Sequence, residues 1–266
     1  MSNWRSYDDV AETYERIHAP RLAEPARDLV SVADPAPAAH VLDVGTGTGV
    51  AAEVAISVVG DGGLVVGVDE SHGMLEVGRR ARPAVRTVAA EAIDLPFPDG
   101  SFDIVIGNFV LAHFTKFQTA LYDILRVLRP NGRLALTAWA DGDDQLTQTW
   151  LELVWSVVPR QVLESAIADA TPWRDRFRRR EALEEALMDA GLRHVRVERR
   201  QYRFQYSLED YVDGLGAWAT GRFLREMLGD RAWGSFRSRA IDVFSDRFAN
   251  PVLDFRDVHV AVGTKP

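Results

Sequence analysis

Between residues 40 and 139, short apolar runs alternate with longer amphipathic segments. The short runs are rich in Val, Ile and Leu on both faces, which is typical of parallel strands covered by helices on both sides. The pattern predicts strands at 40–45, 64–69, 84–89, 102–108 and 132–139. It predicts helices at 50–60, 71–82 and 116–132. This alternation indicates a doubly wound α/β sheet, and such sheets bind ligands at the carboxyl ends of their strands.

Outside residues 40–139, the pattern of hydrophobic and polar residues has other periods. Residues 4–32 have an amphipathic helical pattern, and 180–192 predict a helix closed by Gly191. Residues 193–204 and 257–265 alternate with period two, so we expect them to pair antiparallel at one sheet edge. The expected fold is a mostly parallel, seven-stranded sheet with an antiparallel edge strand.

The expected domain organisation is one domain over residues 1–266 with a ligand-binding core at 40–139. Helical additions at 1–35, 143–175 and 207–250 are expected over the carboxyl ends of the strands, as lid and substrate elements.

Composition and charge narrow the class of protein. The 266 residues are 47% hydrophobic and carry a formal net charge of −8, with no cysteine. The strongest basic cluster, "RDRFRRR" at 174–180, is followed by acids and indicates an exposed helix start. No secretory leader, membrane span or metal-ligand spacing is visible, so we expect a cytoplasmic protein without metal, nucleic-acid or membrane partners. The sequence leaves the oligomeric state open.

The candidate ligand site begins at "VLDVGTGTG", residues 41–49, where glycines follow an apolar run. The spacing G-x-G-x-G differs from the G-x-G-x-x-G that seats a dinucleotide pyrophosphate, and no G-K-[ST] follows. The carboxylate of Asp43 would repel a diphosphate but attract an ammonium or sulfonium group. The loop therefore favours an adenosine ligand with positive charge.

Two further acids fit an adenosine ligand. Asp69 ends the second strand about 20 residues after the loop, where a carboxylate can accept both ribose hydroxyls. Its alternative role is the N-cap of the next helix, which Ser71 could also provide. Glu91 could accept from the adenine amino group while the amide of Ala92 meets a ring nitrogen. A solvated loop position is the alternative for Glu91.

Four motifs in this order closely resemble those of class I S-adenosylmethionine-dependent methyltransferases: "VLDVGTGTG", "VVGVDESHGML", "AEAIDLPFPDGSFDIVIGNFVLAHF" and "ILRVLRPNGRLALTAW". The similar subgroup includes menaquinone and ubiquinone C-methyltransferases and natural-product methyltransferases. The resemblance implies a Rossmann-like fold, S-adenosylmethionine as cofactor and S-adenosylhomocysteine as product. It also implies methyl transfer to a small organic acceptor, such as an aromatic or hydrophobic metabolite.

The resemblance also implies roles for single residues. Asp43 would take the methionine ammonium, Asp69 the ribose and Glu91 the adenine. The other implied cofactor residues are Tyr14, Gly45, Thr46, Gly47, Gly49, Glu70, Met74, Ala92 and Asn108. Tyr14 would close over the cofactor, or else pack on a helix face. Glu70 departs from the usual apolar residue, and Glu91 from the more frequent Asp, so the purine could be held more weakly or shifted.

His113, just past the fourth strand, is the candidate general base, with a structural role as the alternative. His18 and His72 are expected on exposed helix surfaces and receive no role. Trp139, Trp150, Trp173 and Trp218 are the candidate acceptor-binding residues, although each could instead pack a helix onto the sheet.

Three other classes compete with the small-molecule methyltransferase. A nicotinamide-dependent oxidoreductase should have the G-x-G-x-x-G spacing, which is absent. A non-catalytic binder of S-adenosyl ligands fits the same motifs. A macromolecule-directed methyltransferase should carry a basic docking surface, which a net charge of −8 does not favour.

Overall fold

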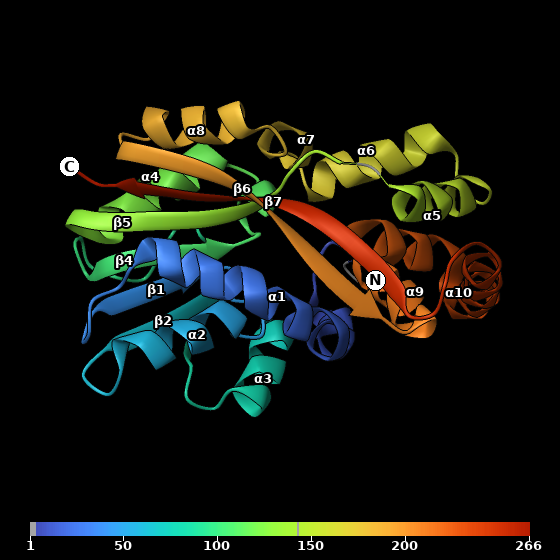
Figure 1. The fold of residues 1–266 in the computed structure, drawn as a ribbon, viewed down its shortest axis with the longest axis horizontal. Coiled ribbons are helices and arrows are strands. Elements are labelled where there is room, and N and C mark those ends of the chain that lie inside the picture. The colour runs from blue at the N-terminus through green and yellow to red at the C-terminus, as the bar shows by residue number, and fades with distance from the viewer. Residues whose placement is uncertain (1–3, 143) are drawn as a thin grey trace.

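A computed structural model describes residues 4–142 and 144–266 of the chain (Figure 1). The expected helical segments at 1–35 and 143–175 therefore begin on residues outside the described part. Seven strands form one sheet in the order β3-β2-β1-β4-β5-β7-β6. The strands are β1 His40–Val44, β2 Leu64–Asp69, β3 Arg86–Ala89, β4 Phe102–Asn108, β5 Leu128–Trp139, β6 Arg193–Tyr206 and β7 Val252–Thr264. This arrangement confirms the predicted α/β class.

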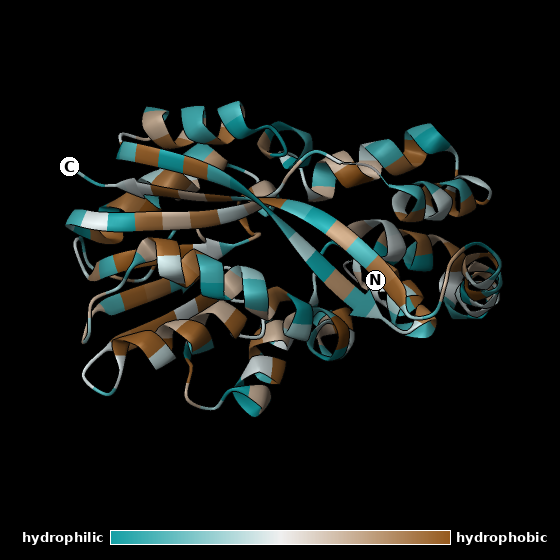
Figure 2. Cartoon of the chain, in the orientation of Figure 1, coloured by the Kyte–Doolittle hydropathy of each residue, from teal (hydrophilic) through white to brown (hydrophobic). Residues whose placement is uncertain are grey.

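The first five strands are parallel, as their apolar pattern predicts. In the hydropathy colouring of Figure 2, β1, β2 and β4 are largely brown, because helices cover both of their faces, whereas β3 at the sheet edge is only partly buried. One boundary differs from the sequence expectation. Leu128 already pairs with Phe102, so β5 starts before the "RPNG" turn rather than after it.

The two strands of period two pair antiparallel, as predicted. β7 runs antiparallel between β5 and β6, so the antiparallel strand lies one position inside the edge, which β6 forms. β5 pairs with β7 only as far as Val258, whereas β6 and β7 stay paired to Tyr206 and Val252. The free part of this pair is a two-stranded ribbon that reaches past the sheet toward α9 (Figure 1).

The helices complete two layers around the sheet and a third group beyond its carboxyl edge (Figure 1). They are α1 Ala11–Ala33, α2 Val50–Val59, α3 His72–Ala81, α4 Phe117–Val127, α5 Gln145–Trp155, α6 Arg160–Ala170, α7 Arg174–Phe177, α8 Arg180–Asp189, α9 Leu208–Ala217 and α10 Ala219–Arg247, with 3₁₀ turns η1 Asp8–Val10 and η2 Leu111–His113. Among the described residues, no helix has the length and apolar character needed to cross a membrane.

Side-chain alternation along each strand separates the two layers. Val41 joins the core formed with α1 and α2, whereas Leu42 and Val44 join the core formed with α4 and α8. A third core belongs to the helical additions, where Trp150, Phe236 and other apolar residues of α5, α6, α9 and α10 pack together. The additions thus bury their own apolar surface and are joined to the sheet at the end where ligands bind.

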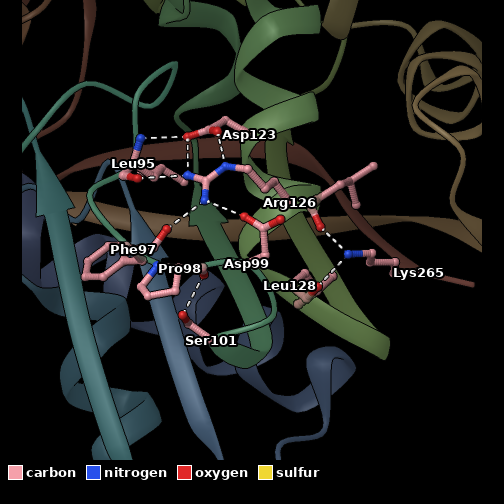
Figure 3. A network of polar contacts seen from close by, with 10 residues as sticks. Leu95, Phe97, Pro98, Asp99, Ser101, Asp123, Arg126, Leu128 and Lys265 are labelled. Carbon is pink, nitrogen blue, oxygen red and sulfur yellow. Dashed lines mark hydrogen bonds and ion pairs between the residues drawn. The ribbon is translucent and has the colours of Figure 1, made fainter.

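A polar network fixes the loop that follows β3 (Figure 3). Arg126 of α4 donates to the carbonyls of Leu95 and Phe97 at 2.9 and 2.7 Å. Asp123 accepts from the Leu95 amide at 2.6 Å and from Arg126 Nε at 2.7 Å. Burial alone would raise the pKa of Asp123, but these hydrogen bonds outweigh it and lower the pKa below its ordinary value. The loop that begins at Glu91 is thereby held to α4.

We expect Asp123→Asn to lower the free energy of unfolding at pH 7 by about 2 kcal/mol, because a charge-assisted buried hydrogen bond is lost. A carboxylate with a lowered folded pKa stabilises the fold above the ordinary Asp value of about 4, and this is lost as the pH falls through the folded pKa. The difference from wild type should therefore shrink toward pH 3 in urea titrations.

The matched control is Asp99→Asn, since Asp99 is 82% exposed but contacts the same guanidinium. An exposed pair contributes little, so this variant should unfold like wild type. Equal losses for the two variants would contradict the importance of the buried pair.

Candidate functional site

The glycine loop joins β1 to α2 in a conformation that only glycine adopts easily. Gly45, Gly47 and Gly49 have φ angles of +67°, +56° and +93°, all in the left-handed region. A Cβ atom at Gly45 would also collide with the side chain of Val110. The loop therefore presents bare backbone at the carboxyl end of β1, which allows a ligand close approach.

The side chain of Asp43, near the end of β1, holds this loop by hydrogen bonds. It is fully buried, and Oδ2 accepts from the Thr46 hydroxyl at 2.7 Å and from the Ala52 amide at 3.1 Å. Oδ1 is buried without a hydrogen-bond partner among the described residues. Burial raises the pKa of Asp43 to about 7. A buried carboxylate oxygen with no donor is costly, so this position favours a cationic donor beside the loop.

Asp69 lies beside the loop at the end of β2. Its carboxylate accepts from the Gly47 amide at 2.8 Å and from the Ser71 amide at 2.9 Å, and burial raises its pKa. Ser71, not Asp69, caps α3, because its hydroxyl accepts from the Met74 amide. The cap alternative for Asp69 is therefore wrong, and Asp69 instead joins the glycine loop to the start of α3.

Acidic residues surround this end of the sheet. Partial desolvation raises the pKa of Glu70, and the negative charges of Asp69, Glu91 and Asp8 add to the effect. Glu70 and Glu91 are themselves exposed. Such a field disfavours phosphate groups and favours a cation. This agrees with the sequence argument against a dinucleotide.

The remaining predicted cofactor residues lie on the same edge. Met74 is buried among Ala11 and Val77, with Tyr7 and Tyr14 packed against them. A Cβ at Gly47 would lie 3.1 Å from Met74 Cε, which places this side chain against the loop. Ala92 packs on the core formed with α4 and α8.

The end of β4 is held by Thr137 of the neighbouring strand. The Thr137 hydroxyl donates to Asn108 Oδ1 at 2.7 Å and accepts from the Phe109 amide at 2.9 Å. Phe109 has a φ of +60°, a strained conformation for a bulky residue, and its ring stacks on Trp139 with centroids 4.1 Å apart. The network thus directs an aromatic ring toward the space above the sheet.

That space is a cavity of about 790 Å³ between the sheet edge, the ribbon and helices α5, α6, α9 and α10. Its aromatic lining consists of Tyr7, Phe109, Trp139, Trp150, Trp155, Phe177, Tyr206, Tyr211, Trp218 and Phe255. Three of the four predicted tryptophans belong to it. Trp173 does not, since it packs edge-on against Phe117 of the core with centroids 4.7 Å apart. Its assignment to the acceptor pocket is therefore corrected.

His113 ends η2 and lines the cavity beside Tyr7, with ring centroids 5.9 Å apart. Its imidazole forms no hydrogen bond with any other described residue. Burial lowers the pKa of His113 to about 4, and the positive charge of Arg222 adds to the effect. The ring is therefore neutral at pH 7 and free to accept a proton or hydrogen bond from a ligand.

The expectation for His18 is wrong, whereas His72 is exposed as expected. His18 is only 1% exposed, stacks on Trp218 at 4.5 Å and lies within hydrogen-bond distance of the Gly214 carbonyl. Tyr14, His18 and Arg21 have the spacing i, i+4, i+7, which puts them on one helix face. This periodicity was the available signal that His18 and Arg21 line the cavity.

Arg222 of α10, another residue that the sequence analysis missed, fastens the N-terminal segment over the site. It is 5% exposed and donates to the carbonyls of Trp4, Arg5 and Ala217. Its guanidinium also lies 3.9 Å from the ring centre of Tyr7. Asp8 fastens the same segment to α3 through Ser71 and Gly73. Residues 4–10 thus bridge the sheet domain and the helical additions.

Comparison with known proteins agrees with this geometry. Residues 42–136 match the family model described as a methyltransferase domain. Demethylmenaquinone methyltransferase from Clavibacter sepedonicus is 31% identical over 175 residues, covering 63% of this chain and 70% of that protein. The Renibacterium salmoninarum protein of the same name is 37% identical over 139 residues, covering 50% of this chain and 57% of its own length.

Among solved structures, Haemonchus contortus phosphoethanolamine N-methyltransferase 2 has a TM-score of 0.60 at 18% identity, covering 100% of this chain and 61% of that one. This likeness shows the fold alone. The family-model match and the relative from Clavibacter sepedonicus show that the chain belongs to the class I S-adenosylmethionine-dependent methyltransferase family. It spans about half of the length of the first curated relatives that it matches.

We expect Arg222→Ala to loosen residues 4–10, because three carbonyls lose a buried donor. Chymotrypsin should cut after Trp4 and Tyr7 several times faster than in wild type. The melting temperature should fall by about 4–8 °C, as a loss of about 2 kcal/mol predicts for a protein of this size.

Arg225→Ala is the matched control on the same helix, since Arg225 is half-exposed and pairs only with the exposed Asp230 among the described residues. Its cleavage should equal that of wild type. If Arg222→Ala is cut no faster than this control, Arg222 does not hold the segment.

Proposed function

We propose that this chain transfers a methyl group from S-adenosylmethionine to a small organic acceptor. The observation that carries the proposal is the glycine loop, which is flanked by the buried Asp43 and the half-buried Asp69 and opens beside an aromatic cavity. The names of the relatives support the same reaction class, and demethylmenaquinone methyltransferase is named for a small acceptor.

The residues present fit the cofactor. Asp43 Oδ1 is a buried acceptor without a donor, which suits an ammonium group. Bare glycine backbone at Gly45 and Gly47 admits the methionine and ribose portions, with Asp69 at the ribose hydroxyls. Met74, Glu91 and Ala92 would hold the adenine. When bound, S-adenosylmethionine supplies a methyl group already activated by its sulfonium charge.

The chain's own residues then have three tasks. Residues 40–139 bind the cofactor, while the helical segments at 1–35, 143–175 and 207–250 enclose the acceptor. The segment held by Arg222 excludes water from the site. Holding the two reactants in line supplies roughly 7–11 kcal/mol of barrier lowering, so orientation accounts for most of the catalysis.

His113 is the proposed proton acceptor. Its pKa of about 4 keeps the ring neutral at physiological pH, so it is available as a base at every pH above about 5. The same low pKa makes it a weak base. His113 therefore suits an acceptor whose own proton leaves easily better than one with an unactivated hydroxyl.

The cavity favours a small acceptor over a macromolecule. About 790 Å³ lies within the range of pockets for small ligands, roughly 300–1,000 Å³. Its lining of flat rings suits an aromatic or hydrophobic molecule. Residues of α5, α6, α9 and α10 form part of its walls.

A calorimetric titration with S-adenosylhomocysteine beside NADH tests the cofactor assignment. We expect micromolar binding of the thioether and none of NADH. Asp69→Ala should weaken S-adenosylhomocysteine by about tenfold or more, because hydrogen bonds to a charged group are lost. Asp61→Ala, an exposed acid in the turn after α2, is the matched control and should bind like wild type. Binding of NADH alone would overturn the proposal.

Binding should also release a proton near neutral pH. The pKa of Asp43 is about 7, and an ammonium beside Oδ1 stabilises the charged form and lowers that pKa. Affinity for S-adenosylhomocysteine should therefore be nearly constant above pH 8 and fall about tenfold by pH 6. Calorimetry in buffers of different ionisation enthalpy measures the released proton directly.

Asp43→Asn is the control for this linkage, because the amide still accepts from Thr46 but cannot ionise. It should bind more weakly and release no proton from this position. The same proton release from wild type and Asp43→Asn would remove Asp43 from contact with the ammonium.

A further inference from the structure

Arg21 occupies a position in the acceptor cavity that the proposed methyl transfer leaves unexplained. It lies on the face of α1 that also carries Tyr14 and His18, and it lines the cavity. Seven residues separate it from Tyr14, which corresponds to roughly 10 Å along a helix. The His18 ring links the two side chains, since it lies 5.3 Å from the Tyr14 ring centre and its Nδ1 lies 3.2 Å from Arg21 Nη1.

The Arg21 guanidinium is held among aromatic rings. It lies 4.8–5.7 Å from the ring centres of four side chains: Trp139, Phe204, Tyr206 and Trp218. Nη1 lies 3.2 Å from His18 Nδ1, and His18 Nε2 lies 3.0 Å from the Gly214 carbonyl. Because arginine only donates, Nδ1 accepts and Nε2 carries the hydrogen. The neutral histidine thus orients the guanidinium without neutralising it.

No carboxylate forms an ion pair with this guanidinium, although the charge of the buried Asp254 acts on it from a greater distance. Within residues 4–142 and 144–266, Arg21 forms no ion pair, and its Nε is buried without a partner. The neighbouring cation Arg256 differs, since it pairs with Asp254 at 2.6 Å and Asp144 at 3.4 Å. Ring faces attract a cation but do not replace an anion. The nearby acids Asp254 and Asp144 are thus already paired with Arg256, and Arg21 itself lines the cavity without an ion-pair partner among the described residues.

Two buried tyrosines lie at this part of the cavity. Tyr206 is 6% exposed and its hydroxyl interacts with Arg21, whereas Tyr211 is 3% exposed and its hydroxyl has no partner among the described residues. Their rings are in edge contact at 5.4 Å, and the Arg21 guanidinium lies 5.4 Å from the Tyr206 ring centre. Buried polar groups are normally hydrogen-bonded, so donors left over in a cavity indicate a ligand that accepts.

We propose that Arg21, together with the Tyr206 and Tyr211 hydroxyls, binds an anionic oxygen group of the acceptor, a carboxylate or a phenolate. This inference rests on the proposed function and names the acceptor class: a flat, apolar molecule with an acidic group. The aromatic lining binds the body of the molecule, and Arg21 selects for its charge.

The test compares two probes of equal shape, 2-naphthoate and 2-naphthamide. Their affinities are measured by quenching of tryptophan fluorescence, with and without S-adenosylhomocysteine. Wild type should bind the carboxylate at least about tenfold more tightly than the amide, as expected for a charge-assisted hydrogen bond in a desolvated site. Arg21→Gln should reduce the preference to about twofold or less, while Arg21→Lys retains part of it.

Two further variants separate recognition from folding. Tyr206→Phe removes only the hydroxyl and should weaken the carboxylate several-fold without affecting the amide. Arg27→Gln, on an exposed position of the same helix, removes an equal charge outside the cavity and should leave both affinities unchanged. A drop in Arg27→Gln equal to that in Arg21→Gln would mean that general charge, not Arg21, causes the preference.

The outcomes distinguish this inference from the proposed function. If S-adenosylhomocysteine binds but wild type binds the two probes equally, or binds neither, the acidic-acceptor inference is overturned and the methyltransferase proposal stands. A preference that survives in Arg21→Gln also overturns it. If S-adenosylhomocysteine fails to bind while the Arg21-dependent preference persists, the anion site stands and the proposed function falls.

Discussion

The candidate site depends on the hydrogen bonds that the buried carboxylate of Asp43 accepts. By accepting from the Thr46 hydroxyl and the Ala52 amide, it fixes both sides of the glycine loop at once. The Thr46 side chain then lies over β2, where a Cβ at Gly67 would be only 2.6 Å from the Thr46 hydroxyl. The Thr46 amide also donates to the Val68 carbonyl at 2.9 Å. The loop is thus pressed against β2, which brings the Gly47 amide to Asp69.

This constraint has an electrostatic cost that a cation would offset. Burying Asp43 makes its charged form unfavourable, which its raised pKa expresses. Burial raises the pKa of Asp69 for the same reason. Two carboxylates whose charged forms are disfavoured by burial lie beside a loop of bare backbone. Such a site is less stable empty than with a positive group present. The fold therefore accepts a local instability at the position where the cofactor is proposed to bind.

The sequence predicted the features that depend on neighbours along the chain. Strand and helix periods, the loop at Gly45–Gly49 and the acid at Asp69 are all local patterns, and the sheet order follows from them by the rules of doubly wound folds. The choice between Ser71 and Asp69 as helix cap was also local, but it needed hydrogen-bond geometry. The periodicity of α1 was a signal for the buried face that carries His18, but Arg222 and the Trp173 contact with Phe117 could not be predicted, because each depends on segments that meet only in the folded chain. The apolar pattern of α1 marks a buried face without saying what covers it.

The placement of Arg21 also bears on the proposed chemistry. A guanidinium in contact with a nucleophilic oxygen would stabilise its lone pairs and lower its reactivity. In the proposed arrangement Arg21 instead contacts a separate acidic group of the acceptor, so that it binds the acceptor without opposing the attack. Methyl transfer from a sulfonium to an anionic nucleophile disperses charge in the transition state, so an aromatic cavity of low polarity favours the reaction. A weak neutral base such as His113 is adequate for such an acceptor, because the acceptor is already anionic or loses its proton easily. In the proposed reaction the acidic loop, the aromatic cavity and Arg21 thus divide cofactor binding, chemistry and acceptor selection among different parts of one site.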